Sequence, residues 1–258
     1  MLTESLIREH TNLNKGILIG YSGGPDSTAL VHLLSSLKAY QELDVKAIHI
    51  NHNLSKHSAM WENHCIETCS KLNINLITES IEIKVDGGGL ESASRKARYR
   101  VFEKILNAGD QLLLGHHSDD VAETLFMRLL RGTGPDGMEG PKLQRPLGKG
   151  VLIRPFLEIS KKQILDYLNI NNIDYIEDDS NLSNDFDRNY LRNEIFPMLE
   201  RKWNNFPNRI NNFSKIIKDR NNSYSYLMHE KYNDLITNSV DLKKLRELSN
   251  PVISDVLR

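Results

Sequence analysis

The stretch Gly20-Tyr21-Ser22-Gly23-Gly24-Pro25-Asp26-Ser27-Thr28 decides the fold of this chain. It follows a short apolar run, Ile17–Ile19, that is typical of a buried strand, and it precedes apolar residues at helical spacing over 29–37. A strand, a glycine-rich turn and a helix aim backbone N–H groups and the positive end of the helix dipole at one point. The stretch therefore predicts a phosphate-binding loop.

The residue types in this loop limit the kinds of ligand that it can bind. Gly23 and Gly24 let the backbone approach a phosphate closely and adopt positive φ angles. Ser22 and Ser27 add hydroxyl donors, whereas Asp26 would repel a phosphate unless a cation such as Mg²⁺ lay between them. The Gly-Lys-Ser/Thr signature of a Walker loop is absent from the sequence. The alternative interpretation is an ordinary strand-to-helix turn with Ser27 as the helix cap.

The composition is that of a globular protein. The 258 residues are 39% hydrophobic and 26% charged, which suits one large domain or one domain with a smaller companion. No apolar run has the length of a membrane span, and the first fifteen residues contain no apolar signal core. We therefore expect a cytoplasmic protein that does not associate with membranes.

Two cysteines, Cys65 and Cys69, lie four residues apart on a helical pattern. This spacing is typical of a buried stripe in a reducing compartment rather than of a disulfide framework. His52, His57 and His64 lie nearby, but their spacing fits no common metal-binding pattern. The sequence thus gives little support to a metal site in this segment.

Apolar runs alternate with helical patterns along the chain. The runs lie at 17–20, 45–50, 74–83, 112–114 and 151–153, and the helical patterns at 27–38, 58–72, 92–107 and 119–130. This alternation predicts an α/β fold with a doubly wound, mostly parallel sheet, followed by a small helical domain. Ligands of such sheets bind beyond the carboxyl ends of the strands, so we expect the functional residues there.

Polar residues follow the second predicted strand. Ile50 and His52 lie where backbone groups could frame a nucleotide base. Polar residues at strand ends are equally common as turn formers, so the sequence leaves both interpretations open.

The segment after the fourth strand combines imidazoles with carboxylates. His116 and His117 precede Asp120 and Glu123, which lie one turn apart on one helix face. Compensation of the helix dipole explains acidic residues in the first turn, but it does not explain Glu123. Two inward carboxylates beside two imidazoles suit a bound cation, either a metal ion or an ammonium group.

Two arginines lie on the helix predicted over 92–107. Arg98 falls near the middle of its apolar face and Arg95 falls close to it. A guanidinium in a core must find an anion, because leaving it unpaired is costly. An internal salt bridge is one solution. The proximity of the helix start to the predicted phosphate site favours a phosphate.

Residues 132–150 contain nine Gly or Pro among nineteen and predict a long loop. Such loops are usually functional or disordered, and we expect a substrate lid. Residues 1–186 carry 20 basic and 25 acidic side chains, whereas residues 187–220 carry eight basic and four acidic ones. We predict a catalytic domain over 1–186 and a basic, helical domain over 187–258 that contacts nucleic acid, although a solvated helix face has a similar composition.

Ordered segments over about 15–215 together resemble the tRNA(Ile)-lysidine synthetases, a family of N-type ATP pyrophosphatases with an adenine nucleotide alpha hydrolase-like fold. The matching segments are Ser-Gly-Gly-Pro-Asp-Ser-Thr at 22–28, Ile-His-Ile-Asn-His-Asn-Leu at 48–54, Glu-Ser-Ala-Ser-Arg-Lys-Ala-Arg-Tyr at 91–99, His-His-Ser-Asp-Asp-Val-Ala-Glu-Thr at 116–124, Arg-Gly-Thr-Gly at 131–134, Glu-Asp-Asp-Ser-Asn at 177–181 and Arg-Asn-Tyr-Leu-Arg at 188–192. Asn53 and Val121 replace residues that are often Gly and Gln in the family.

The resemblance implies an activity. The chain would use ATP with Mg²⁺ to adenylate the carbonyl oxygen at carbon 2 of the wobble cytidine in tRNA(Ile) with a CAU anticodon. The ε-amine of free L-lysine would then displace AMP and leave lysidine.

The resemblance also implies site residues. Phosphates and Mg²⁺ would be held by Ser22, Gly23, Gly24, Pro25, Asp26 and Ser27, with Asp26 as the metal ligand. Arg95 and Arg98 would stabilise charge on the transferred group, and His117 would contact the phosphates or the cytidine. Asp120 and Glu123 would hold lysine or metal. The remaining nucleotide or tRNA contacts would be Ile50, His52, Gly115, Arg188 and Arg192.

Other functions share parts of this pattern. A tRNA thiolase would want more cysteines than two at helical spacing. A ligase acting on small metabolites would not need the basic segment after 187, and a non-catalytic nucleotide-binding module would have little use for Arg98, Asp120 and Glu123. The sequence leaves a homodimer open. Because residues 251–258 have a helical pattern, we also expect a truncated or short form whose weak tRNA binding falls steeply with salt.

Overall fold

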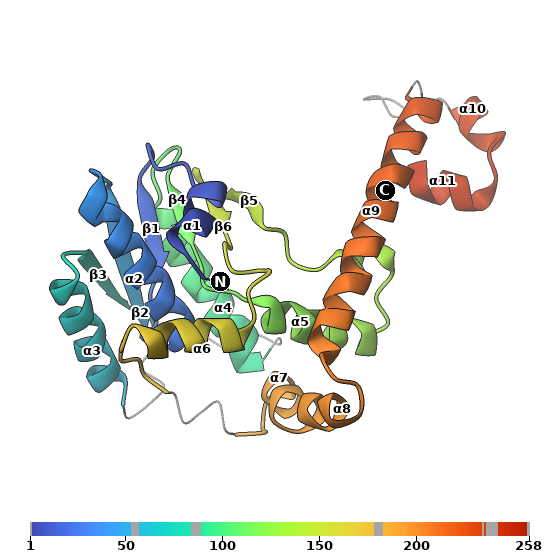
Figure 1. Cartoon of the computed structure of the whole chain (residues 1–258). Helices are drawn as coiled ribbons and strands as arrows, with labels where there is room; N and C mark the ends of the chain where they lie inside the picture. Colours follow the sequence, from blue (N-terminus) through green and yellow to red (C-terminus); the bar gives the residue numbers. More distant parts are fainter. Residues whose placement is uncertain are drawn as a thin grey trace. The chain divides into compact units, whose positions relative to one another are not determined.

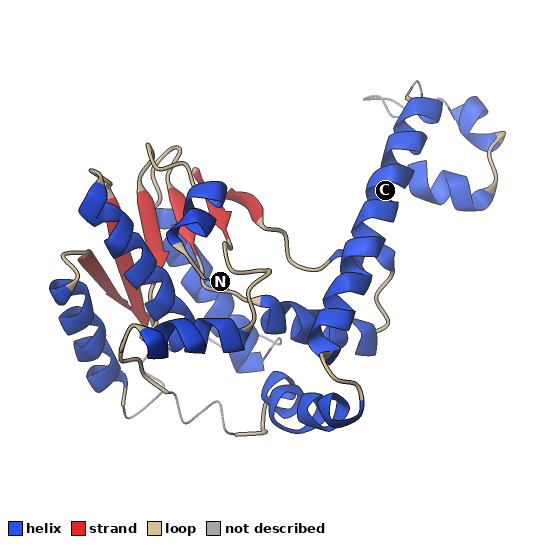
Figure 2. Cartoon of the chain, in the orientation of Figure 1, coloured by secondary structure: helices blue, strands red, loops and turns tan. Residues whose placement is uncertain are grey.

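The computed structural model describes residues 2–52, 57–83, 89–177, 183–233, 235 and 242–256. The chain forms two compact units, one of residues 1–124 and 141–208 and the other of residues 125–140 and 209–258. All strands in the described ranges belong to the first unit (Figure 2). The predicted motif residues at 53–54 and 178–181 lie outside the described residues.

The first unit is built on a six-stranded sheet in the order β3-β2-β1-β4-β6-β5. The strands are β1 (Ile17–Gly20), β2 (Val45–Asn51), β3 (Asn75–Ser80), β4 (Gln111–Leu113), β5 (Gln144–Leu147) and β6 (Gly150–Ile153). Five of them run parallel, and only β5 is antiparallel to its neighbour β6. The predicted α/β fold with a mostly parallel sheet is therefore confirmed.

Helices cover both faces of this sheet (Figure 1). In chain order they are α1 (Glu4–His10), α2 (Pro25–Tyr40), α3 (Ser58–Lys71), α4 (Gly89–Ile105), α5 (Ser118–Leu130) and α6 (Lys161–Ile170). Residues of α1, α2, α3 and α6 share one buried cluster, whereas α4 contributes Phe102 to a second cluster, together with Leu106 just after the helix. The helices therefore sort onto opposite faces, as in a doubly wound sheet.

Alternation along the central strands explains the two clusters. In β1, Ile17 and Ile19 pack in the first cluster and Leu18 packs in the second. Successive side chains of a strand point to opposite faces, so a strand buried on both faces is apolar throughout. This is why the sequence shows unbroken apolar runs.

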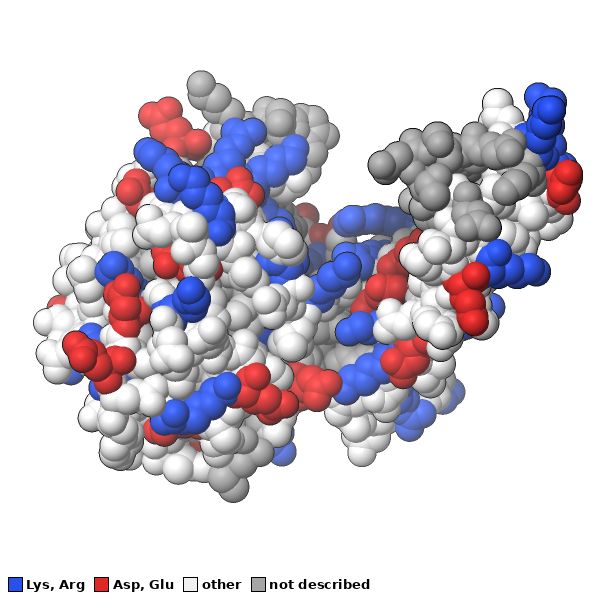
Figure 3. All heavy atoms as spheres, turned by 90° about the horizontal axis from the view of Figure 1, so that it is seen from above, with Lys and Arg blue, Asp and Glu red and all other residues white. Residues whose placement is uncertain are grey.

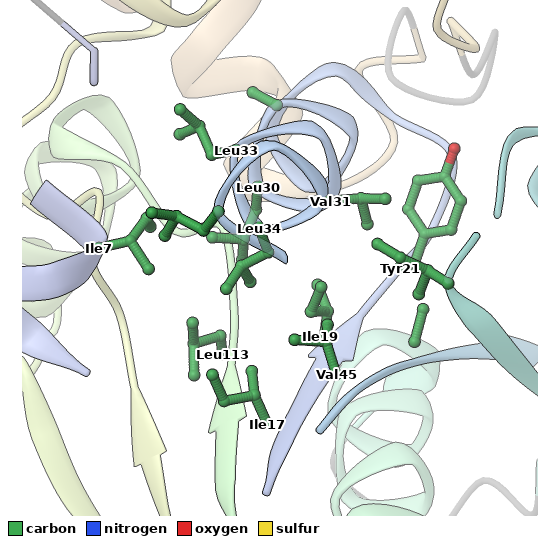
Figure 4. Packing of buried hydrophobic residues seen from close by; sticks show 14 of the residues in the cluster. Ile7, Ile17, Ile19, Tyr21, Leu30, Val31, Leu33, Leu34, Val45 and Leu113 are labelled. Atoms are coloured by element: carbon green, nitrogen blue, oxygen red, sulfur yellow. The ribbon is translucent and has the colours of Figure 1, made fainter. Parts of the chain in front are cut away.

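Helix α2 anchors the loop to the sheet. Its residues Leu30, Leu33 and Leu34 are almost fully buried and pack over β1 and β4, as Figure 4 shows. Burying one such side chain stabilises the fold by roughly 1.5–3 kcal/mol. The start of α2, which carries the glycine-rich loop, is therefore held rigidly.

Helices continue the chain after the sheet, and one of them, α9, is 27 residues long. They are α7 (Asp187–Tyr190), a π-helical turn at Leu191–Ile195, α8 (Phe196–Lys202), α9 (Phe206–Tyr232), α10 (Leu242–Arg246) and α11 (Asn250–Val256). The helical character predicted after residue 187 is confirmed. The functional division at 186/187 stays a prediction, because the compact units divide at other residues.

The segment 132–150 has more structure than a loop. It contains a 3₁₀ helix at Pro135–Glu139 and the strand β5, which forms a hairpin with β6. The sequence missed β5, and the assignment of this segment as a lid stays a prediction. The strand predicted over 74–83 is shorter in the structure, where β3 spans Asn75–Ser80. No helix in the described ranges is long and apolar enough to cross a membrane.

Candidate functional site

The glycine-rich loop joins β1 to α2 with a compact set of hydrogen bonds. Ser22 N donates to Ser27 Oγ at 3.2 Å, Ser27 Oγ donates to Gly24 O at 3.1 Å, and Thr28 Oγ1 donates to Gly23 O at 3.1 Å. Gly23 has φ +84°, a conformation that strains any residue with a side chain. Pro25 opens α2, so the free N–H groups of the first turn face the loop.

Gly115 lets the end of β4 approach this loop. A Cβ atom at Gly115 would lie 2.9 Å from both the carbonyl carbon and the oxygen of Asp26. Only a residue without a side chain allows this contact. The structure thus supports a packing role for Gly115, which the sequence associated with the nucleotide.

A cavity of about 570 Å³ opens at the carboxyl ends of β1, β2 and β4. Its lining joins the loop, the end of β2 and one face of α4. The lining residues are Gly20, Tyr21, Ser22, Asp26, Ser27, Ile48, His49, Ile50, Asn51, His52, Ser58, Trp61, Leu90, Arg98, Tyr99, Phe102, Leu114, Gly115, His116, Asp120 and Phe186. The cavity therefore brings together half of the sequence-predicted site residues, namely Ser22, Asp26, Ser27, Ile50, His52, Arg98, Gly115 and Asp120.

The β2 side of the cavity combines apolar side chains with a neutral imidazole, that of His52. Ile50 and His52 line it beside Trp61. Burial lowers the pKa of His52 to about 4, and the charge of Arg98 adds to the shift. His52 Nδ1 is buried without a hydrogen-bond partner. A flat ligand with polar edges, such as a nucleotide base, suits this wall.

The two arginines of α4 separate in the structure. Arg98 lines the cavity, whereas Arg95 is exposed and is not part of the lining. Arg95 Nη2 instead donates a hydrogen bond to the phenolic oxygen of Tyr99 at 3.3 Å. The sequence expected both near the middle of one apolar face, and the structure places only Arg98 in the cavity.

Asp26 in the loop has two basic neighbours. Lys161 Nζ lies 2.7 Å from Asp26 Oδ1, and His117 Nε2 lies 3.7 Å from the same oxygen. Lys161 is the first residue of α6, and its backbone N–H donates to Asp119 Oδ2 at 2.8 Å. The Asp26 carboxylate is thus already balanced by a cation.

The adjacent histidines differ in protonation. Burial lowers the pKa of His116 to about 3 against the attraction of Asp120, and its Nδ1 has no hydrogen-bond partner. Burial also disfavours the charged form of His117, but its contact with Asp119 and the charges of Asp120 and Asp26 outweigh burial and raise its pKa. His116 lines the cavity, whereas His117 lies behind it and is only 3% exposed.

Asp120 and Glu123 are held by two arginines from the segment after 187. Arg188 Nε donates to Glu123 Oε2 at 2.6 Å, and its Nη2 donates to Asp120 Oδ1 at 2.8 Å. Arg192 binds Glu123 through Nε at 2.7 Å and through Nη2 at 2.9 Å, and Nη2 also reaches Asp120 at 3.3 Å. Glu123 is only 2% exposed. In this structure two guanidiniums therefore lie against both carboxylates, and a metal ion or ammonium group as their ligand stays a prediction.

Asp120, Glu123, Arg188 and Arg192 form the four-charge cluster, in which opposite charges stabilise each other. Burial alone would raise the pKa of Asp120, but the charges of His117 and Arg188 outweigh it and hold that pKa well below its ordinary value. Burial opposes the charge of Arg188 as well, yet Asp120 and Glu123 raise its pKa. The Asp120 carboxylate and the guanidiniums of Arg188 and Arg192 are therefore ionised at neutral pH.

A family model described as a PP-loop domain matches residues 3–199. This chain belongs to the PP-loop domain family. The name of this family model specifies ATP binding, which supports ATP as the nucleotide that binds the glycine-rich loop at 20–28, from here on called the PP-loop.

Curated relatives extend the match. The tRNA(Ile)-lysidine synthase of Coxiella burnetii is 41% identical over 203 residues, which are 78% of this chain and 45% of that protein. The tRNA(Ile)-lysidine synthase of Buchnera aphidicola subsp. Schizaphis graminum is 35% identical over 260 residues, which are 100% of this chain and 58% of that protein. The chain spans about half the length of the curated relatives it matches.

Among solved structures, the U34-tRNA thiolase NcsA from Methanococcus maripaludis with its [4Fe-4S] cluster superposes with a TM-score of 0.63. The match covers 83% of this chain and 77% of that one, at 18% sequence identity. Likeness at this identity confirms the fold of the PP-loop domain.

The PP-loop fits a magnesium nucleotide. In the described part of the chain no three His, Cys, Asp or Glu side chains form a group that could hold a metal ion by themselves. Mg²⁺ in phosphate-binding sites commonly takes one or two carboxylates and completes its shell with phosphate oxygens and water. Asp26, which is 28% exposed at the cavity wall, supplies one such carboxylate.

Sequence reasoning missed one functional residue of this domain. Lys161 reaches Asp26 across 135 positions of sequence. The signal in the sequence is the Ser160-Lys161-Lys162-Gln163 pattern of a capping box, which is present in the structure and fixes the start of α6. That box locates a helix start but does not say what the helix start faces.

Proposed function

We propose that this chain carries the catalytic domain of an enzyme that ligates lysine to carbon 2 of the wobble cytidine of tRNA(Ile), with ATP as the activating substrate. One observation carries the proposal: the lining of a single cavity includes both the PP-loop and Asp120, which belongs to the cluster of Asp120, Glu123, Arg188 and Arg192. A phosphate site and a site for a charged amine therefore open into the same space.

The relatives support the same reaction. Proteins named tRNA(Ile)-lysidine synthase match this chain at 35–42% identity, and one match covers its whole length. The PP-loop, the paired carboxylates and both arginines lie within or beside the matched family region, residues 3–199.

In the first half-reaction the carbonyl oxygen at carbon 2 of the cytidine attacks the α-phosphorus of ATP, and pyrophosphate leaves. Backbone N–H groups of the PP-loop and the hydroxyls of Ser22 and Ser27 hold the phosphates. Asp26 would hold Mg²⁺, which lowers the repulsion between the phosphates and the attacking oxygen. Arg98 lines the cavity and stabilises negative charge on the transferred group.

In the second half-reaction the ε-amine of lysine attacks carbon 2, the C–O bond to AMP breaks, and the amine loses a proton. Asp120 and Glu123 orient the lysine and accept that proton. Arg188 and Arg192 pair with both carboxylates until the lysine arrives. The guanidiniums are partly exposed, at 26% and 39%, so they can shift to admit a second cation.

The two thiols argue against the alternative function as a tRNA thiolase. Cys65 and Cys69 are 0% and 1% exposed, and burial raises the pKa of each thiol to about 12. A thiol that stays protonated and has no access to the cavity is a poor nucleophile. The proposed ligase uses neither cysteine.

The partners follow from this reaction. They are tRNA(Ile) with a CAU anticodon and free L-lysine, and the compartment is the cytoplasm, where both occur with ATP. A homodimer remains a prediction.

Incorporation of tritiated lysine into unmodified tRNA(Ile) tests the proposal. We expect acid-precipitable label that depends on ATP and releases one pyrophosphate per lysine. Unmodified tRNA with a different wobble base is the control and should stay unlabelled. Sulfur incorporation instead of lysine, or ATP binding without either product, would contradict the proposal.

A further inference from the structure

Three arginines converge on Tyr99 in the first unit. The guanidinium carbons of Arg95 and Arg145 each lie 5.1 Å from the centroid of the Tyr99 ring. The Arg154 guanidinium also contacts Tyr99, and its Nη1 donates to the carbonyl oxygen of Lys142 at 2.6 Å. The three arginines come from α4, from β5 and from the residue that follows β6. The fold thus gathers three cations from separate elements.

No carboxylate balances these charges in the described part of the chain, where Arg95, Arg145 and Arg154 form no ion pair with Asp or Glu. Arg188 and Arg192, by contrast, each pair with two carboxylates. Three positive charges around one phenol are therefore left for an external anion.

Burial increases the cost of this arrangement. Arg154 is only 5% exposed. Burial lowers its pKa, and although Tyr99 opposes the shift, the charges of Arg145 and Arg95 add to it. A buried guanidinium without a counter-ion is expensive to maintain, so a bound anion would stabilise this cluster. Planar guanidiniums are suited to phosphate, because they donate two parallel hydrogen bonds.

The cluster lies beside the cavity rather than in it. Tyr99 lines the cavity, whereas Arg95, Arg145 and Arg154 are not among its lining residues. The phosphates of ATP are already assigned to the PP-loop, so the anion belongs to another group. Arg95 is exposed and Arg145 is half-buried, so these two guanidiniums are accessible to a large partner, whereas the buried Arg154 adds its charge to the cluster.

We propose that Arg145 and Arg154, with Arg95 at their edge, bind a backbone phosphodiester of the RNA substrate, next to the nucleotide that enters the cavity. This inference rests on the proposed function for the identity of the polymer. It assigns the RNA contact to a local site on the catalytic unit. Figure 3 shows acidic and basic side chains interspersed over the visible face of the molecule. A face of mixed charge would bind RNA through local clusters of basic residues.

The test compares Arg145→Gln with Lys149→Gln, which removes the same charge from an exposed residue of the same hairpin. The affinity of each full chain for a tRNA(Ile) transcript is measured by fluorescence anisotropy over a series of salt concentrations. Loss of one phosphate contact on single-stranded RNA lowers the slope of log K against log salt by about 0.7, or roughly fivefold in affinity at ~0.1 M salt relative to ~1 M. We expect this change for Arg145→Gln only, and its rescue by Arg145→Lys.

ATP binding by the same proteins separates the sources of phosphate. We expect Arg145→Gln to bind ATP as the unmodified chain does. A matching loss of ATP affinity would assign the arginines to the triphosphate and overturn the inference. An unchanged salt slope, or no RNA binding by the unmodified chain, would also overturn it. A salt slope that responds to Arg145→Gln in a protein that fails to incorporate lysine would uphold the phosphate site and overturn the proposed function.

Discussion

The ammonium group of Lys161 lies 2.7 Å from the carboxylate of Asp26, although the two residues are 135 positions apart in sequence. The PP-loop has no lysine of its own, and α6 delivers one to it. Lys161 therefore occupies the carboxylate that we expect to bind Mg²⁺ with ATP. The lysine and the metal ion must compete for Asp26 unless the lysine moves to the phosphates.

Replacing Lys161 by Met should strengthen metal binding. An ion pair that is about one-third exposed contributes on the order of 0.5–1 kcal/mol, which corresponds to a two- to fivefold change in affinity. We expect Mn²⁺ to bind Lys161→Met two- to fivefold more tightly than the unmodified chain in the presence of a non-hydrolysable ATP analogue. Electron paramagnetic resonance of free Mn²⁺ measures this directly. Lys162→Met is the control, because Lys162 is an exposed neighbour with no contact to Asp26. Weaker Mn²⁺ binding by Lys161→Met would show that Lys161 assists the metal nucleotide instead.

Asp26→Ala should abolish nucleotide turnover and leave the fold intact. Asp26 is partly exposed and makes no contact with the buried clusters, so its loss removes a ligand and not a packing contact. We expect pyrophosphate release to fall to background while the circular dichroism spectrum and thermal midpoint stay close to those of the unmodified chain. Release at the unmodified rate from a folded variant would remove Asp26 from the mechanism.

The sequence predicts the sheet well where both faces are buried. The central strands β1, β4 and β6 contain unbroken apolar runs, and β2 is largely apolar with polar residues such as Lys46 and His49, because each face of the sheet meets a layer of helices. The edge strand β5 was missed for the opposite reason. Its Gln144, Arg145 and Pro146 carry no apolar pattern, and proline is tolerated at an edge because it need not donate to a neighbour.

In the site, too, some features can be predicted from the sequence and others cannot. The PP-loop and the order of Asp120 and Glu123 are local patterns, and their spacing alone indicates a phosphate and a cation. The partners of these groups are long-range: Arg188 meets Glu123 across 65 positions, and no local pattern specifies such a pairing. The sequence accordingly required a cation near Asp120 and Glu123 without naming Arg188 and Arg192 as that cation.

The pKa values of His116 and His117 should be shifted in opposite directions from that of a free histidine. Burial keeps His116 neutral down to about pH 3, whereas Asp119, Asp120 and Asp26 keep His117 protonated above its ordinary pKa of 6.5. Two-dimensional NMR of ¹⁵N-histidine-labelled protein measures both pKa values. We expect one ring to titrate above 6.5 and the other to stay neutral at pH 5. Two rings that both titrate near 6.5 would contradict the geometry of the cluster.

The two histidines should affect stability with opposite signs. Both titrate near 6.5 in the unfolded chain. The contribution of His117 to the free energy of unfolding is present below pH 6.5 and is lost as the pH rises through its raised pKa. The contribution of His116 is present above pH 6.5 and is lost as the pH falls toward 3. We therefore expect the unfolding free energy of the unmodified chain to exceed that of His117→Gln by less at about pH 9 than at about pH 6. Urea unfolding at both pH values measures the difference, and a gap that widens with pH would contradict the assignment.

The four-charge cluster sets the last prediction. Glu123 is almost fully buried, and its two guanidinium partners are its counter-ions in the absence of lysine. Breaking a fully buried pair costs about 3–5 kcal/mol, and the partial exposure of Arg188 and Arg192 lowers that figure here. Glutamine keeps the shape and one acceptor oxygen of glutamate. Glu123→Gln should therefore fold with a lower thermal midpoint.

Glu123→Gln should separate the two half-reactions. The PP-loop and Asp26 are unaltered in this variant, so pyrophosphate release with tRNA should persist. Lysine incorporation should fall by roughly two orders of magnitude or more, because a neutral amide cannot accept the proton of the attacking amine. Glu103→Gln, which changes an exposed carboxylate on α4, is the matched control and should leave both steps unchanged. If Glu123→Gln instead stops pyrophosphate release while lysine binding is unaffected, the carboxylates act on the metal nucleotide and their assignment to lysine is wrong.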